Sequence, residues 1–251
     1  MMRIARVQSF LARALVLAAC AFSHPTTRAM KPDNEFFATG PQAALEIAIR
    51  ADDVNAMTRA LADGASANGI GKFNITPLMV AVDAQSPRAV AALLKAGALP
   101  NAKALDGNGP VSLAVKSCRA EPNGFDIMLA VFKAGGDPDT RQPDNDPVLM
   151  RFILDHDAQG LALMKSLGAN LNIHVRSGRP LINNVAFSGD WDMAWALIEL
   201  GVDIDDDKST HEIIKVMGLK GPVPGTTQYA YKLKVWQFLR DKGLPVRPLV
   251  Q

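Results

Sequence analysis

Apolar residues recur along the chain in clusters three and four positions apart, the spacing that lines one face of an α-helix. Val90, Leu93 and Leu94 form one such cluster. A glycine follows each apolar stretch, and glycine commonly ends a helix because it readily takes the left-handed conformation. The intervals between these glycines are 33, 38, 33, 33 and 42 residues, for Gly64, Gly97, Gly135, Gly168, Gly201 and Gly243. The pattern predicts short helices repeated along the chain.

Prolines recur in a matching phase at Pro77, Pro110, Pro147 and Pro180, with intervals of 33, 37 and 33 residues. Proline in the first turn of a helix costs no hydrogen bond and presets the φ angle. We therefore expect each proline to open the first helix of a pair. One pair cannot bury its apolar face alone, so neighbouring pairs must stack. The predicted fold class is all-α.

The segment Thr76-Pro77-Leu78-Met79-Val80-Ala81 is similar to the ankyrin signature T-P-L-H-x-A, with Met79 in place of the histidine. Looser copies surround Pro110, Pro147 and Pro180. On these motifs and the period of about 33 residues, the chain resembles the ankyrin-repeat family from about residue 42 to 246. This resemblance implies a solenoid of helix-turn-helix pairs joined by β-turn finger loops, with four clear repeats and capping units at both ends.

The glycine and proline phases divide this region into units. The third unit has about five extra residues within 117–126, which are either a tolerated insertion or a protrusion specific for a partner. In the last unit, Ser209-Thr210-His211-Glu212 predicts a capping box at the start of a helix. A final amphipathic helix is expected over 229–242, with aromatic residues that close the stack. The expected units lie near 42–71, 72–104, 105–141, 142–174 and 175–208, with a C-terminal cap at 209–246.

The N-terminal region has the layout of a secretory signal, with three arginines before the short apolar run 14–22. We assign 1–20 to this signal and 21–41 to a tether. Leu17-Ala18-Ala19-Cys20 resembles a bacterial lipobox, which implies that Cys20 becomes the lipidated first residue. Ordinary cleavage after Ala21 or Ser23 is the alternative, and both interpretations export the protein. The resemblance implies a periplasmic protein that is lipid-anchored to the outer membrane, since alanine rather than aspartate follows Cys20.

Charge and candidate chemistry narrow the functional classes. Without the first 19 positions the chain has 24 basic and 25 acidic residues, which gives no electrostatic reason to expect a nucleic acid partner. Cys118 is the only other cysteine, so no internal disulfide is expected and its thiol is predicted to be inert. The four histidines lack the spacing of metal ligands on one helix, and no nucleophile elbow or phosphate-binding loop is present. We expect no enzymatic activity, no metal and no cofactor.

A repeat stack offers a binding face made of loop tips and the exposed side of each first helix. The distance of each position from its proline predicts which residues lie on this face, and Ile153, Val175 and Ala186 are among them. Phe73, Leu105, Arg176 and Phe187 are the expected anchors, because such side chains dominate contact energies, although each could instead lie in an ordinary loop. The candidate partner-binding residues are Lys72, Phe73, Ile75, Asp83, Leu105, Asp106, Asn108, Lys116, Gln142, Asn145, Arg176 and Phe187.

A narrower resemblance rests on the lipobox, Phe36-Phe37, Leu78-Met79 and the segment 235–246. Together these are similar to small exported bacterial ankyrin lipoproteins that act as immunity partners of type VI secretion lipases. The resemblance implies a protein that binds and neutralises a secreted phospholipase toxin in the periplasm, with membrane contact only through Cys20. Two alternatives remain open at this point. One is a periplasmic helper that supports a host enzyme such as a catalase, and the other is a structural protein of the envelope.

Overall fold

The computed structural model describes residues 36–204, 207–218, 221–247 and 249. The regular elements of these residues are all helices, and their only β-type pairing consists of two isolated bridges, Arg141 with Pro147 and His174 with Pro180. The prediction of an all-α chain is confirmed. Cys20 and the expected signal 1–20 lie outside the described residues.

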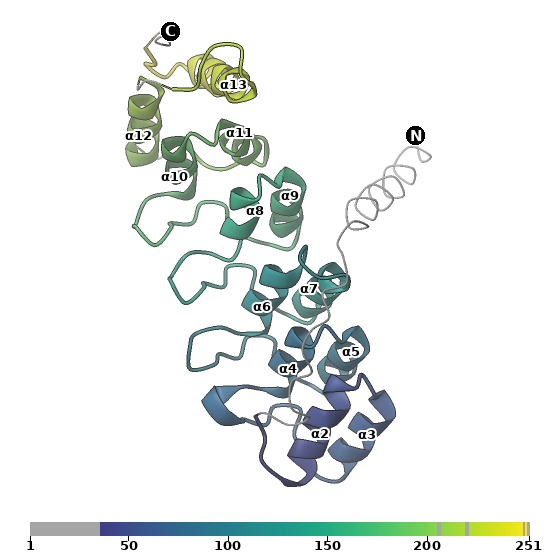
Figure 1. The fold of residues 1–251 in the computed structure, drawn as a ribbon. Helices are drawn as coiled ribbons and strands as arrows, with labels where there is room; N and C mark the ends of the chain where they lie inside the picture. The colour runs from purple at the N-terminus through teal and green to yellow at the C-terminus, as the bar shows by residue number, and fades with distance from the viewer. Residues whose placement is uncertain (1–35, 205–206, 219–220, 248, 250–251) are drawn as a thin grey trace, which may run out of the picture.

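The helices follow one another in pairs that stack along an elongated, gently curved array (Figure 1). The first helix of a pair packs on the first helix of the next pair, as in α2, α4 and α6, and second helices pack likewise, as in α3, α5 and α7. The pairs are α2 (Gly40–Arg50) with α3 (Val54–Ala62), α4 (Pro77–Asp83) with α5 (Pro87–Lys95), α6 (Pro110–Ser117) with α7 (Gly124–Lys133), α8 (Met150–Leu154) with α9 (Ala158–Ser166), α10 (Leu181–Ser188) with α11 (Trp191–Glu199), and α12 (Asp207–Met217) with α13 (Thr227–Asp241).

One hydrophobic core runs the length of the array, from Phe37 to Leu239. Fully buried leucines such as Leu45, Leu93 and Leu181 lie between successive pairs. No pair encloses a core of its own, so the apolar face of each helix is covered by its neighbours. This is the arrangement expected when stacking, rather than a single central core, stabilises the chain.

A ladder of polar side chains joins successive pairs. Asn68, Asn101, Asp139 and Asn172 occupy equivalent positions, and an oxygen of each accepts a backbone N–H of the next unit at 2.7–2.8 Å. The amide groups of Asn68 and Asn101 also donate, at 2.9 Å, to the carbonyl of the glycine that follows the second helix of the next pair. The spacing between units is therefore fixed by hydrogen bonds as well as by packing.

The connection between α6 and α7 is longer than the connections within the other pairs from α2 to α11. It comprises the six residues 118–123, against three residues in the connections 84–86 and 155–157. The extra length lies inside the range 117–126 expected from the sequence.

This longer connection is attached to the pairs on both sides of it. The Asn123 amide donates to the carbonyl of Gln85 at 3.3 Å. The Arg119 guanidinium pairs with the carboxylate of Asp157, which is 7% exposed and also accepts the N–H of Gly160 at the start of α9. The insertion thus joins three successive pairs through its own side chains.

The folded region begins earlier than the expected boundary at residue 42. α2 begins at Gly40, and Phe37, which was assigned to the tether, is a buried core residue. The reason is the buried carboxylate of Glu46, which accepts the backbone N–H groups of Phe36 and Phe37 at 3.0 Å. The assignment of 36–41 to a tether is therefore wrong.

The last pair also differs from the expectation. α12 begins at Asp207, so Ser209 lies inside the helix and the predicted capping box is wrong. The N-cap of the following helix, α13, is Thr226, whose hydroxyl oxygen accepts the N–H of Tyr229 at 3.2 Å. Its Leu239 is fully buried and its Phe238 packs edge-on against Trp195.

The prolines do not all occupy one position. Pro77 and Pro110 are the first residues of α4 and α6, as expected. Pro180, however, precedes α10 as its N-cap, and Pro147 lies three residues before α8. The later two prolines are one position earlier in their units, which explains why the proline interval of 37 differs from the glycine interval of 38.

Candidate functional site

Four five-residue hairpins project along one edge of the array, one residue before α4, α6 and α10 and three residues before α8 (Figure 1). In each hairpin the N–H of the first residue donates to the carbonyl of the fifth at 2.8–2.9 Å. We call these hairpins fingers 1 to 4, and they comprise residues 71–75, 104–108, 142–146 and 175–179.

The fourth residue of every finger has a positive φ angle. These residues are Asn74, Gly107, Asn145 and Gly178, with φ of 58°, 81°, 69° and 77°. Glycine and asparagine tolerate this conformation better than other residues. Asn145, a candidate binding residue, therefore occupies a position at which the turn itself favours asparagine.

The second and third residues of each finger form its tip. Finger 3 shows that the count from the prolines was wrong by one position. Gln142, a candidate residue, is the half-buried first residue of that finger, and Val175, the first residue of finger 4, is only 5% exposed. The tips are Lys72 and Phe73, Leu105 and Asp106, Pro143 and Asp144, and Arg176 and Ser177.

The same shift applies to the first helices. Ile153 and Ala186 are each 1% exposed, whereas their neighbours Leu154 and Phe187 are 69% and 59% exposed. Sequence reasoning thus missed Leu154 in addition to the tip residues of finger 3. The register could have been recognised in the sequence from the asparagine or glycine at the fourth position of each finger, which tolerates the positive φ of the turn.

The remaining candidates lie at the base of the fingers or on the first helices. Ile75 and Asn108 are half-buried fifth residues of fingers 1 and 2, Asp83 is half-buried at the end of α4, and Lys116 is exposed on α6. Hydrogen bonds from the side chain and the backbone N–H of Asn108 lower the pKa of Asp106. Asn108 therefore stabilises the finger that carries Leu105.

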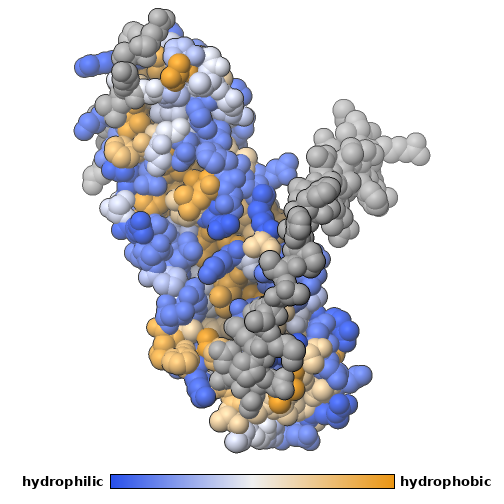
Figure 2. All heavy atoms as spheres, in the orientation of Figure 1, coloured by the Kyte–Doolittle hydropathy of each residue, from blue (hydrophilic) through white to orange (hydrophobic). Residues whose placement is uncertain are grey.

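Three exposed apolar side chains lie on or just before fingers 1 and 2, together with the charged tip residues Lys72 and Asp106. Ile70, Phe73 and Leu105 are 72%, 66% and 69% exposed. The N–H of Leu105 donates to the carbonyl of Phe73 at 2.9 Å, so the two tips are adjacent. Figure 2 shows hydrophobic side chains gathered on this edge of the molecule. We call Ile70, Phe73 and Leu105 the apolar finger edge.

The backbone of Phe73 is unusual for an aromatic residue. Its φ and ψ angles are 58° and 24°. A left-handed conformation costs a residue with a Cβ atom roughly 1–2 kcal/mol. Such a cost at an exposed aromatic side chain is typical of a functional rather than a packing role.

Fingers 3 and 4 carry charged side chains and, unlike fingers 1 and 2, no large exposed apolar side chain. The guanidinium of Arg176 lies 3.4 Å from the carboxylate of Asp144 and 3.5 Å from that of Asp146. The backbone N–H of Arg176 also donates to Asp146 at 2.8 Å. Because exposed ion pairs contribute little to stability, a partner can replace these pairs with contacts of its own at a small cost in free energy.

Phe187 is the exposed aromatic residue of α10. The guanidinium of Arg179, at the base of finger 4, lies 4.4 Å from the centre of the Phe187 ring. This contact places Phe187 on the side of the helix that faces the fingers. Leu154 of α8 is exposed on the preceding unit, so apolar residues also occur beside the charged fingers.

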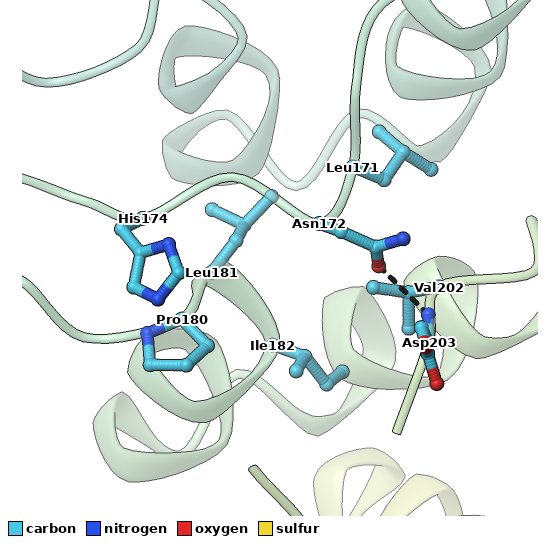
Figure 3. A pocket seen from close by; sticks show the side chains of 8 residues that line it. All are labelled: Leu171, Asn172, His174, Pro180, Leu181, Ile182, Val202 and Asp203. Carbon is cyan, nitrogen blue, oxygen red and sulfur yellow. Dashed lines mark hydrogen bonds between the residues drawn. The ribbon is translucent and has the colours of Figure 1, made fainter. Parts of the chain in front are cut away.

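The pocket in Figure 3 is small. Its volume is about 110 Å³, and the Asn172 side-chain oxygen at its wall accepts the N–H of Asp203. Pockets for organic ligands are usually about 300 Å³ or more, so this one is too small for them. It is lined by Leu171, Asn172, His174, Pro180, Leu181, Ile182, Val202 and Asp203.

Within the described residues, no cluster of three histidine, cysteine or acidic side chains could hold a metal ion, and none of the helices there has the length and hydropathy to cross a membrane. Cys118 is 3% exposed, and desolvation raises the pKa of its thiol to about 11. A thiol with so high a pKa has almost no reactive thiolate at neutral pH.

The comparisons with known proteins are limited. No protein-family model matches the chain. Over 183 residues, 72% of its length, the chain is 26% identical to the E3 ubiquitin-protein ligase KEG of Arabidopsis thaliana. The match covers 11% of that protein. The chain thus corresponds to about a tenth of the plant protein, and the similarity is to that part alone.

Proposed function

We propose that this chain is an ankyrin-type repeat protein that acts as a protein-binding scaffold and not as an enzyme. The observation that carries the proposal is the row of fingers in register, with Phe73 and Leu105 exposed side by side at adjacent tips. A few side chains supply most of the energy of a protein interface, and an aromatic or aliphatic anchor that enters a pocket of the partner can be one of them. The motif Thr76-Pro77-Leu78 at the start of α4 supports the ankyrin assignment.

We further propose that the partner is a secreted phospholipase toxin and that the scaffold is its immunity protein in the periplasm. This step rests on the resemblance of the lipobox, Phe36-Phe37 and the segment 235–246 to ankyrin lipoproteins of that kind. The mechanism would be stoichiometric, since a scaffold can obstruct the lipase or its approach to the membrane without chemistry of its own. A lipid on Cys20 would raise the local concentration of the inhibitor at the membrane under attack.

The immunity role predicts that a toxic enzyme is encoded beside this gene, and the test begins with that enzyme. Wild-type protein should bind that enzyme with a dissociation constant in the nanomolar range, as other stable protein pairs do. Phe73→Asp with Leu105→Asp should weaken binding at least roughly 100-fold, because both anchors are lost and charges are introduced. Leu99→Asp is the matched control, since Leu99 is also exposed, at 60%, but lies outside the fingers.

The biological arm of the test uses competition between siblings. Cells that lack the gene should be killed by wild-type neighbours, and the double finger variant should fail to protect them. If the deletion strain survives unharmed, the immunity role is wrong. Sensitivity to oxidants in the deletion strain would instead favour a helper of a host enzyme such as a catalase.

A further inference from the structure

Charge is distributed unevenly along the chain. Residues 36–220 carry 17 basic and 22 acidic side chains, whereas residues 221–251 carry five basic and one acidic. α13 lies at the opposite end of the array from α2 and α3 (Figure 1). One end of an otherwise acidic stack is therefore strongly basic.

Most of these bases reach the surface. Lys234 and Arg240 of α13 are exposed, as are Lys242 and Arg247 after it. Lys232 is the exception, because it is 3% exposed and burial lowers its pKa. Four of the five cationic side chains are thus accessible at the basic end.

Half-buried aromatic rings lie beneath the exposed cations. The ammonium of Lys234 is 4.7 Å from the ring centre of Tyr231 and 5.7 Å from that of Trp195. The guanidinium of Arg240 lies 4.6 Å from the Trp236 ring. Long basic side chains with apolar stems beside amphipathic rings are typical of protein surfaces at a membrane–water interface.

Two exposed aliphatic side chains complete this surface. Leu233 of α13 is 40% exposed, and Val223 in the connection that precedes α13 is 69% exposed. The region therefore combines attraction to anions with shallow apolar insertion.

We propose that α13 and the residues that follow it, to 247, form a docking surface for an anionic lipid bilayer. Six positions along a helix leave Lys234 and Arg240 about 120° apart around its axis, on either side of Leu233, so these cations border one exposed face and do not converge on a concave site. A bilayer requires no matching shape, since basic residues near it are attracted by its surface potential. The charges therefore fit a bilayer better than an acidic protein.

The rest of the charge distribution sets the orientation of the docked stack. The excess of acidic side chains over 36–220 is repelled by an anionic surface, while the basic end is attracted. The stack would stand on its C-terminal end, with the apolar finger edge accessible to a protein. This inference does not depend on the identity of the protein partner.

The test is co-sedimentation of the full-length chain with lipid vesicles, in a Cys20→Ser background so that no acyl chain contributes. Vesicles of phosphatidylglycerol and phosphatidylcholine in equal parts should bind the protein at least roughly tenfold more tightly than phosphatidylcholine alone. Lys234→Gln with Arg240→Gln should weaken this binding about 25-fold, or about fivefold for each base removed. Arg247→Gln alone should weaken vesicle binding about fivefold. Because Arg247 lies outside α13, this variant tests the charge without a change in the helix, and its circular dichroism melt checks that it is folded.

The control is Lys95→Gln with Lys165→Gln, which removes the same charge from exposed positions on α5 and α9. Its binding should stay within about twofold of the parent, as the effect is local to the basic end. An equal loss in the control pair, or no preference for anionic vesicles, overturns the proposal. Binding to soluble poly-glutamate without binding to vesicles would also overturn it, in favour of an acidic protein.

Discussion

At the scale of single residues, two buried polar side chains have opposite surroundings. The carboxylate of Glu46 accepts two backbone N–H groups and pairs with Arg50 at 2.8 Å. Asn183 of α10 is 1% exposed, and its side-chain oxygen and nitrogen have no hydrogen-bond partner. A polar group loses water on burial and must regain hydrogen bonds to offset that loss. Glu46 therefore supports the fold, whereas Asn183 weakens it.

Asn183→Leu should stabilise the protein, because it removes an unsatisfied amide and keeps a side chain that branches at the same carbon. We expect the free energy of unfolding to rise by about 1 kcal/mol. Urea denaturation measures the change, and Asn184→Leu, at the half-buried neighbouring position, is the control. A clear loss of stability in Asn183→Leu would show that the amide is hydrogen-bonded in solution.

Glu46→Ala should destabilise the first helix pair strongly. The substitution removes the carboxylate that accepts the N–H groups of Phe36 and Phe37 and pairs with the cation of Arg50. We expect the free energy of unfolding to fall by about 3 kcal/mol. Glu199→Ala, at an exposed site on α11, should change stability by less than about 0.5 kcal/mol. Equal melting curves for the two variants would disprove the role assigned to Glu46.

At the scale of elements, the helices and their terminating glycines could be predicted, but the finger register could not. Proline is accepted both as the first residue of a helix and just before it, so Pro147 and Pro180 carried no information about which position they occupy. Asn74, Gly107, Asn145 and Gly178 were the better markers, since a positive φ restricts the residue type. Their intervals of 33, 38 and 33 repeat those of the glycines. The apolar tips Phe73 and Leu105 were found because the first two prolines do open their helices.

A polar cluster links three elements near the C-terminal end. Nδ1 of His156, which follows α8, lies 2.7 Å from the carboxylate of Asp192 on α11, and Nε2 lies 3.8 Å from Asp190. Gln228 of α13 donates to the other oxygen of Asp192 at 2.8 Å. The hydrogen bond to Asp192 raises the pKa of His156 above its ordinary value. The cluster is therefore strongest when the imidazole is protonated.

This cluster predicts a pH dependence of stability. Because the pKa of His156 is raised by folding, its contribution is complete below the unfolded value of about 6.5 and is lost as pH rises through the folded value. The parent's advantage over His156→Gln in unfolding free energy should be about 0.5 kcal/mol larger in mild acid than at pH 8. The expected value is small because the imidazole is half exposed. Denaturation at the two pH values checks this, and a difference that grows with pH would contradict it.

At the scale of the whole molecule, stability should be divided among units because each pair contacts only its neighbours. Hydrogen exchange of Glu46→Ala should show faster exchange in α2 and α3, with little change in α8 to α11. A uniform increase along the chain would mean that the stack unfolds as one cooperative body. The apolar finger edge on fingers 1 and 2 lies near the affected pair, whereas the basic end lies far from it.

The ladder of Asn68, Asn101, Asp139 and Asn172 also bears on how the chain comes to be folded. Each rung, like the contact of Asn123 with Gln85, joins residues only 29 to 38 positions apart. A chain that emerges N-terminus first, from a ribosome or through a narrow channel, can form each rung as soon as one further unit is free. Contacts so local favour fast folding. The protein can therefore be completed unit by unit, with the basic C-terminal end added last to a stack that already displays its fingers.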